Sequence, residues 1–475
     1  MSALAAASTG IARRNMATPR EIVIVGGGIM GCTTAYFLSR HPSYSPESHH
    51  ITLLEAAKTS TGGRTKDSIP DPAILADPAT VSKKNPAHDG IAGGASGKAA
   101  GLLALWAFPD NIAPLSFKLH EDLASEHGGD KRWGYRRCWA SQVELNARLP
   151  PDPDGDAASG RASTTSKSAS TASSRAMHKD HKKKKPELGS TGAPADLDWI
   201  DKESLVAYEG IGTPDNTAQI HPELFTRSIA QLAEDAGVRI VTGARVTAIN
   251  RSSDGSQVES VTYERGGEEI THATTDCVVA AGPWTSRLLP EIDVFEKRTH
   301  SVVFKTPRPF SAHTLFATLK LPAGFRTPVP PGALLGTMEA TPSRRQRMGE
   351  PEIYARPDGT VYVCGPSGDA VKLPLCTDEV EADEARCEDV IAQTHGISDE
   401  LRREGKVLTR QACYVPHGGP FIGQVGSTKG LIVAAGHGVW GIQNGPGTGK
   451  LVSEIIMDGK ATSAKLGDCD PSNAS

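Results

Sequence analysis

The sequence has no long hydrophobic run, no cysteine pair at metal-binding spacing and no excess of basic charge. Its longest nearly apolar run, residues 99–108, is half the roughly 20 residues that a membrane-spanning helix needs, so we expect no transmembrane segment. The eight cysteines are scattered without a C-x-x-C spacing, which indicates reduced thiols, an intracellular compartment and no metal site. A formal net charge of -4 gives no broad positive field, so nucleic acid is not an expected partner.

The N-terminal residues carry arginine but no acid, which is typical of a mitochondrial presequence. We interpret residues 1–20 as a disordered tail, while a presequence or a start at Met16 stays open. No secretory apolar stretch follows the basic residues, and the last residues are not a peroxisomal signal. The expected location is cytoplasmic, with an association with endosomes as a further option.

Two polar segments interrupt the periodic part of the chain. Residues 58–89 are rich in Pro, Asp, Lys and Ser and read as a surface insertion. Residues 150–195 form a low-complexity insertion that cannot bury enough apolar surface to be ordered. Its basic cluster, residues 182–185, is either a solvated loop or a patch for an anionic partner.

The opening residues combine a strand, a glycine-rich turn and a helix. Gly26, Gly28 and Gly31 form G-x-G-x-x-G directly after a predicted strand, and Glu55 ends the next strand. This context suits an adenine dinucleotide, because the glycines let the pyrophosphate approach the helix N-terminus and the acid can bind a ribose hydroxyl. The acid disfavours NADP but leaves both FAD and NAD open.

A second glycine-rich segment, residues 436–449, again follows a strand. We expect its helix to begin between Asn444 and Gly447 and to present free N–H groups to the negative charge at the pyrimidine edge of a reduced flavin. Between the two segments, residues 299–362 alternate short β-like runs with proline-rich turns, which predicts a mostly antiparallel sheet.

These motifs together resemble the superfamily of glycine, sarcosine and D-amino-acid oxidases, which are FAD-dependent oxidoreductases. The resemblance is carried, in the family's order, by "VGGGIMG" with Glu55, "GASGKAAGLL", "GARVTAI", "CVVAAGPWTSRLL", "CYVPHGGPFIG" and "GLIVAAGHGVWGIQNGPGTGKLVSEII". The lysine of "SGKAAG" and the wording of "AAGHGVWGIQNGPGTGK" are similar to a fungal branch of this superfamily.

The resemblance implies an α/β fold with a discontinuous, Rossmann-like FAD-binding domain of the GR2 type and an inserted, mostly antiparallel β substrate domain. We assign residues 21–57, 90–115, 215–295 and 405–460 to the FAD-binding domain. Residues 116–149, 196–214 and 296–404 are assigned to the substrate domain, and residues 461–475 to a tail.

The resemblance also implies which residues hold FAD. The glycine loop and the ribose site contribute Gly26, Gly28, Ile29, Met30, Gly31, Glu55 and Ala56. The second loop contributes Ser96, Gly97, Lys98, Ala99, Gly101 and Leu102, and further contacts come from Val246, Gly282, Trp284, His437, Gly438, Trp440, Gly441 and Ile442. Relatives with covalent flavin carry a cysteine where Arg410 stands here, and Cys413 is out of register, so noncovalent FAD is expected.

Three residues are candidates for catalysis. Arg356 could clamp a substrate carboxylate, with Tyr354 beside it on one strand; an arginine entering a surface hairpin is the alternative. Lys98 either binds phosphate or promotes the reduction of oxygen as a cation near the flavin. His417 either lines the substrate pocket or belongs to a turn.

The predicted reaction is oxidation of a small amine or amino acid by hydride transfer to FAD, with oxygen or another acceptor reoxidising the flavin. One alternative is a dehydrogenase of the same fold that passes electrons to a carrier. The other is a flavin-stabilised adaptor in trafficking or damage response, with a partner bound through the basic insertion.

Overall fold

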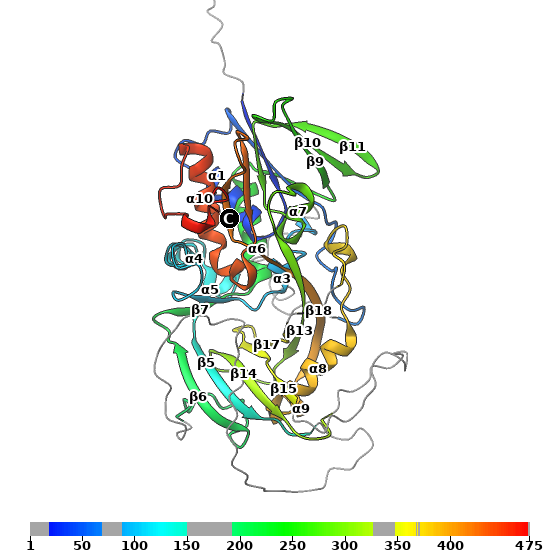
Figure 1. Ribbon diagram of the computed structural model, residues 1–475. Coiled ribbons are helices and arrows are strands. Elements are labelled where there is room, and N and C mark those ends of the chain that lie inside the picture. Colours follow the sequence, from blue (N-terminus) through cyan, green and yellow to red (C-terminus); the bar gives the residue numbers. More distant parts are fainter. Residues whose placement is uncertain are drawn as a thin grey trace, which may run out of the picture.

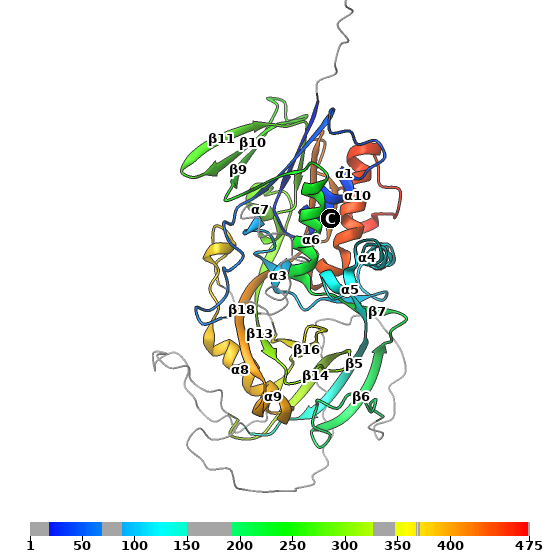
Figure 2. The same ribbon diagram turned by 180° about the vertical axis from the view of Figure 1, so that it is seen from behind.

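The computed structural model describes residues 19–68, 88–149, 192–325, 347–366, 368 and 371–473, which form two lobes (Figure 1 and, from behind, Figure 2). Most of the predicted tail 1–20 and of the insertions 58–89 and 150–195 lies outside the described residues. No helix within the described ranges is long and apolar enough to cross a membrane.

The upper lobe is built on a six-stranded sheet that is parallel except at one edge. Its order is β19-β20-β12-β1-β2-β8, and only β19 runs antiparallel to its neighbour. The strands are β1 (Arg20–Val25), β2 (His49–Glu55), β8 (Arg239–Thr242), β12 (Asp276–Val279), β19 (Phe421–Gln424) and β20 (Leu431–Ala435). Parallel strands are buried on both faces, which explains the continuous apolar runs in the sequence.

Different layers cover the two faces of this sheet. Ile22 and Ile24 of β1 point into a core shared with the helices, whereas Val23 and Val25 point into a core shared with a small antiparallel sheet. The helical layer contains α1 (Ile29–Ser39), α4 (Ala113–His127), α5 (Gly129–Arg132), α6 (Pro222–Asp235) and α10 (Gly441–Asp458). The small sheet contains β9 (Arg245–Arg251), β10 (Val258–Arg265) and β11 (Glu268–Ala273), with α7 (Thr285–Leu288) beside it. The Rossmann-like prediction is confirmed.

The lower lobe is an eight-stranded sheet, antiparallel except between β14 and β5 among its described strands. Its order is β18-β13-β17-β16-β14-β5-β6, with β15 paired to β14. The strands are β5 (Trp139–Asn146), β6 (Leu205–Gly212), β13 (Phe295–Lys305), β14 (His313–Leu321), β15 (Arg347–Gly349), β16 (Glu352–Ala355), β17 (Thr360–Cys364) and β18 (Lys406–His417). The predicted antiparallel sheet is confirmed.

Helices α8 (Glu384–His395) and α9 (Asp399–Arg403) lie against the sheet of the lower lobe. Residues such as Val302, Val363 and Leu315 point from the sheet into the core on this face. Between the lobes lie α3 (Ala95–Lys98) and a three-stranded sheet of β3 (Leu102–Ala104), β7 (Thr217–Gln219) and β4 (Arg136–Arg137). The other face of the large sheet is thus left to face the upper lobe.

Several boundaries differ from the sequence assignments. Helix α4 crosses the boundary placed at residue 115 and packs on α10, while β18 pairs with β13 of the large sheet although 405–460 was assigned to the FAD-binding domain. Residues 461–473, assigned to a tail, bring Leu466 and Cys469 onto the helical core. Helix α10 begins at Gly441, earlier than expected, because Pro446 is accommodated inside its first two turns.

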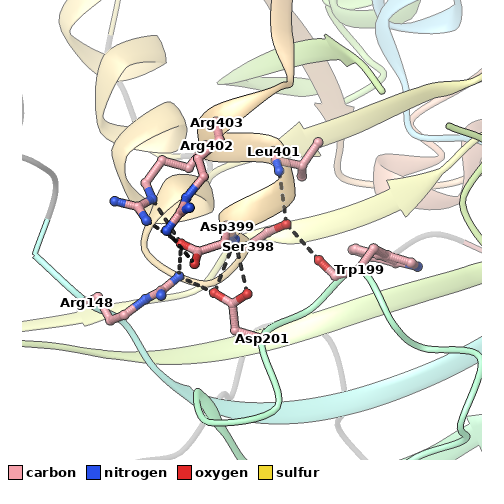
Figure 3. A network of polar contacts seen from close by, with 8 residues as sticks. All are labelled: Arg148, Trp199, Asp201, Ser398, Asp399, Leu401, Arg402 and Arg403. Atoms are coloured by element: carbon pink, nitrogen blue, oxygen red, sulfur yellow. Dashed lines mark hydrogen bonds and ion pairs between the residues drawn. The ribbon is translucent and has the colours of Figure 1, made fainter. Parts of the chain in front are cut away.

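A polar network fixes the chain on both sides of the long insertion (Figure 3). Arg148 forms ion pairs with Asp201 and, at 2.7 Å, with Asp399 at the start of α9. Ser398 caps α9 by accepting from the backbone N–H of Leu401 at 3.3 Å, and its hydroxyl donates to the carbonyl of Trp199 at 2.6 Å. Both ends of the insertion are therefore held on one short helix, away from the space between the lobes.

Candidate functional site

One cavity of about 1090 Å³ runs between the two lobes. At one end it is lined by the glycine loop after β1 and by the end of β2, and at the other by the exposed face of the large sheet. Most of the predicted cofactor residues line it: Gly26, Gly28, Ile29, Met30, Glu55, Ala56, Ser96, Lys98, Ala99, Gly101, Leu102, Val246, Gly282, Trp284, His437, Gly438, Trp440, Gly441 and Ile442.

The glycine loop is shaped by two close approaches. Gly26 has φ +113°, and a Cβ there would lie 2.4 Å from the carbonyl oxygen of Ala280. Gly31 does not line the cavity; a Cβ on it would lie 1.9 Å from the carbonyl oxygen of Gly26, so this glycine lets α1 pack on β1. A Cβ on Gly28 would lie 3.1 Å from Ser96 Oγ, on the cavity side.

Polar groups gather at the N-terminus of α1. The backbone N–H of Ile29 donates to Ser96 Oγ at 2.9 Å. The Glu55 carboxylate accepts from the backbone N–H of Gly27 at 2.6 Å and from that of Ala57 at 2.8 Å. Burial raises the pKa of Glu55, and these two backbone donors oppose the rise. The arrangement places a helix dipole and a half-buried acid where a pyrophosphate and a ribose would bind.

Lys98 lines the cavity, with only 2% of the residue exposed. Its ammonium donates to the carbonyl of Gly93. Burial, with a smaller effect of the nearby Arg64 guanidinium, lowers the pKa of Lys98 to about 8. Gly97, in contrast, does not line the cavity, since it packs against the backbone of Ala92.

The second glycine-rich segment brings the N-terminus of α10 to the cavity. His437 lies just before it, fully buried, and its Nε2 hydrogen-bonds to the hydroxyl of Thr448 at 2.9 Å. Burial lowers the pKa of His437 to about 3, so its ring is neutral near pH 7. Trp440 meets Trp106 edge-on, with ring centroids 5.6 Å apart. This end therefore presents helix N–H groups and aromatic walls rather than a charged side chain.

The large sheet supplies the opposite wall through alternate residues of adjacent strands. Strand pairing sets Phe316, Glu352 and Cys364 side by side on β14, β16 and β17, and sets Tyr354 opposite Tyr362 in the next cross-strand pair. All five residues line the cavity. The Tyr354 hydroxyl donates to the Glu352 carboxylate at 2.5 Å, and the two tyrosine rings meet edge-on at 5.9 Å.

Arg356 does not occupy the position expected of a carboxylate clamp. It follows β16, is 4% exposed and is not among the cavity-lining residues. Its guanidinium lies 5.0 Å from the ring centroid of Tyr362 and donates to the carbonyl of Ala99 at 3.1 Å. Because β16 ends at Ala355, the alternation of side chains along the strand does not extend to Arg356. Its guanidinium instead supports the loop around Ala99. Tyr354 remains on the cavity wall.

Sequence reasoning missed the wall residues Glu352, Phe316 and Cys364. Their alternation is visible in the sequence, but only cross-strand register shows that they meet. His417 lines the cavity at the end of β18, stacked on Phe295 with centroids 5.6 Å apart. Cys413, on the same strand, lines the cavity near Lys98.

The residues present fit FAD. The cavity is long enough to join the ribose site at Glu55 to the N-terminus of α10, which an adenine dinucleotide must span. Two buried polar atoms on its wall, Thr377 Oγ1 and His417 Nε2, have no hydrogen-bond partner among the described residues. Such orphaned groups are unfavourable unless a polar ligand satisfies them. No cluster of side chains that could hold a metal ion occurs in the described ranges.

Comparison with known proteins agrees with this reading. Residues 87–455 match the family of FAD dependent oxidoreductases called DAO, and residues 24–85 match an NAD(P)-binding Rossmann-like domain. The Saccharomyces cerevisiae protein named "Putative oxidoreductase TDA3" is 30% identical, with 96% of this chain and 95% of the yeast chain aligned.

Solved structures share the fold. Glycine oxidase from Bacillus cereus superimposes with a TM-score of 0.58 at 14% identity, covering 93% of this chain and 96% of the other. L-Amino acid deaminase from Proteus myxofaciens, solved in complex with anthranilate, gives a TM-score of 0.59 at 15% identity, covering 97% and 94%. Together with the family match, these observations show that the chain belongs to the DAO family of FAD-dependent oxidoreductases and is an enzyme with FAD as its cofactor.

Proposed function

We propose that this enzyme oxidises a small amine or amino acid at the carbon next to nitrogen. The observation that supports this most is the single cavity: the wall for the flavin, at residues 437–442, faces the sheet wall of Tyr354 and Tyr362 across one continuous space. If residues 437–442 held the flavin, a substrate bound on the sheet would share the same cavity with it. The fold neighbours named as glycine oxidase and L-amino acid deaminase act on compounds of this class.

When bound, FAD supplies the hydride acceptor. The protein's part is to orient the substrate and to exclude water. Phe316, Tyr354 and Tyr362 form an aromatic surface that removes water from the reacting carbon. The phenol of Tyr354 is held by Glu352, so its ring has one fixed orientation and can position the substrate.

We propose that FAD is held without a covalent bond. Arg410, at the position of the tethering cysteine in covalent relatives, donates to Glu388 at 2.8 Å and lies 3.2 Å from Asp67, and it does not line the cavity. Cys413 does line the cavity, but burial raises the pKa of its thiol to about 11. The thiol is therefore protonated near pH 7 and is a poor nucleophile.

Lys98 is the cation best placed to assist oxygen. Its buried ammonium lines the cavity and could stabilise the negative charge that develops as oxygen is reduced. Oxygen is thus the acceptor we favour over a protein carrier.

Anaerobic addition of a panel of amines and amino acids to the purified flavoprotein tests this function. We expect at least one member to bleach the visible flavin absorbance, and admission of air to restore the colour with release of hydrogen peroxide. Failure of every member to bleach the flavin would contradict amine oxidation. Bleaching followed by slow reoxidation in air would identify a dehydrogenase instead.

A further inference from the structure

Glu352 is an acidic side chain on the substrate wall of the cavity. It lies on β16 between Phe316 of β14 and Cys364 of β17, and burial raises the pKa of its carboxyl group. The side chain is half-buried, and withdrawing a carboxylate from water is unfavourable unless hydrogen bonds or a cation offset the loss. Its partners therefore decide whether it serves the fold or a ligand.

The partners of Glu352 are few, neutral and directed at one oxygen. Oε2 accepts from the Tyr354 hydroxyl at 2.5 Å and from the Cys364 thiol at 3.9 Å. Burial raises the pKa of Cys364 well above its ordinary value, so this thiol is uncharged. No donor in the described part of the chain bonds to Oε1, and no ion pair involves Glu352 there.

Lys98 lines the cavity and donates to the carbonyl of Gly93, and three further cationic side chains on the cavity wall also lie near other groups. Arg245 pairs with Glu264 at 2.6 Å beside Val246, at the far end of the cavity. Arg287 donates to the carbonyls of Leu373 and Pro374. Lys297 is exposed and lies 6.0 Å from the ring centroid of Phe295. Within the described residues, none of these three forms an ion pair with Glu352.

Aromatic rings surround the same part of the wall. Phe316 meets Tyr354 edge-on at 6.4 Å, and Tyr354 meets Tyr362 at 5.9 Å. A carboxylate beside aromatic rings is a favourable site for an organic cation, because the charge and the ring faces both attract it.

We infer that Glu352 is the specificity-determining residue for the substrate and binds its ammonium group through Oε1. The site then selects amines whose cationic nitrogen faces the sheet, rather than amino acids held by a carboxylate clamp. This inference rests on the proposed amine chemistry for its substrate class. It concerns charge preference in binding, which can be measured apart from turnover.

Calorimetric titration of the FAD-loaded protein under nitrogen tests the inference. The probes are matched pairs of opposite charge: benzylammonium with benzoate, and cyclohexylammonium with cyclohexanecarboxylate. We expect the cation of at least one pair to bind about tenfold more tightly than its anion, as a charge-assisted hydrogen bond predicts. Glu352→Gln, which keeps the size of the side chain and an acceptor for Tyr354, should weaken cation binding about tenfold and should not weaken binding of the anion, because it removes a negative charge.

Glu350→Gln is the matched control, since Glu350 also lines the cavity but is exposed. It should leave cation binding within about twofold, because an exposed charge is screened by water. Stronger binding of the anions, failure of every cation to bind, or cation binding unchanged by Glu352→Gln would overturn the inference. If amines bleach the flavin but cation affinity does not change in Glu352→Gln, the inference fails and the proposed function stands. If no amine bleaches it, the function fails whatever the titration gives.

Discussion

Lys98 should make the protein without FAD less stable, even though it belongs to the cofactor site. Burial lowers its pKa to about 8, against an ordinary value near 10.5. At any pH at which the buried side chain is charged, that difference corresponds to roughly 3 kcal/mol of destabilisation. The destabilisation is complete at pH values well below 8. It disappears as the pH rises from about 8 to the pKa of Lys98 in the unfolded chain, because in that range only the unfolded chain holds the proton.

Lys98→Met removes this penalty while keeping the length of the side chain. It also removes the hydrogen bond to the Gly93 carbonyl, which contributes about 1 kcal/mol. We therefore expect the variant without FAD to be more stable than the wild type by about 2 kcal/mol at pH 7, and nearly equal to it at pH 10. Binding of FAD should shrink the difference, because phosphate charges nearby raise the pKa of Lys98.

Urea unfolding of both proteins without FAD, followed by tryptophan fluorescence at pH 7 and pH 10, measures the effect. Each difference is taken at one pH, so the other titrating groups largely cancel. A variant that is less stable than the wild type at pH 7 would show that burial of the Lys98 charge is not unfavourable. So would a difference that stays the same at both pH values, because a desolvated charge must lose its effect on deprotonation.

Three further outcomes follow from the structure. Gly28→Val should lose bound FAD, as measured by flavin absorbance, because the added side chain enters the cavity near Ser96. Its circular dichroism spectrum should stay unchanged, and retained flavin would contradict the assignment of Gly28 to the FAD site. Ser398→Ala should lower the free energy of unfolding, measured in urea, by about 1–3 kcal/mol, because it removes the cap of α9 and leaves the buried Trp199 carbonyl unpaired. Arg403→Ala removes an exposed partner in the same network and should change this free energy by less than about 0.5 kcal/mol. Acid precipitation should release all of the flavin into the supernatant, and a yellow pellet would mean that Cys413 or another group forms a covalent bond.

The nucleotide-binding lobe was predictable because its signals are local. Gly26, Gly28 and Gly31 follow a strand and open a helix at fixed spacing, and Glu55 ends the next strand. Each of these features depends on residues close in sequence. The start of α10 was placed too late because a proline inside a helix is usually read as its first turn.

The substrate wall was not predictable for the opposite reason. Glu352 meets Phe316 and Cys364 only through the register of three strands, which sequence alternation leaves open. Arg356 was a reasonable candidate by residue type, but the strand ends one residue before it, at Ala355. Its guanidinium therefore points to the Ala99 carbonyl. The packing of α4 on α10 and of β18 on β13 likewise depends on contacts between residues far apart in the sequence.

We propose that the substrate is oxidised between the flavin and the sheet. Thr318 lies on β14, two residues beyond Phe316 on the same face, and lines the cavity from the large sheet. We predict that Thr318→Phe keeps FAD and the fold but slows anaerobic flavin bleaching by an active amine at least about tenfold, because the new ring takes the space of the substrate. Bleaching of this variant at the wild-type rate, with FAD bound, would show that the substrate is oxidised elsewhere.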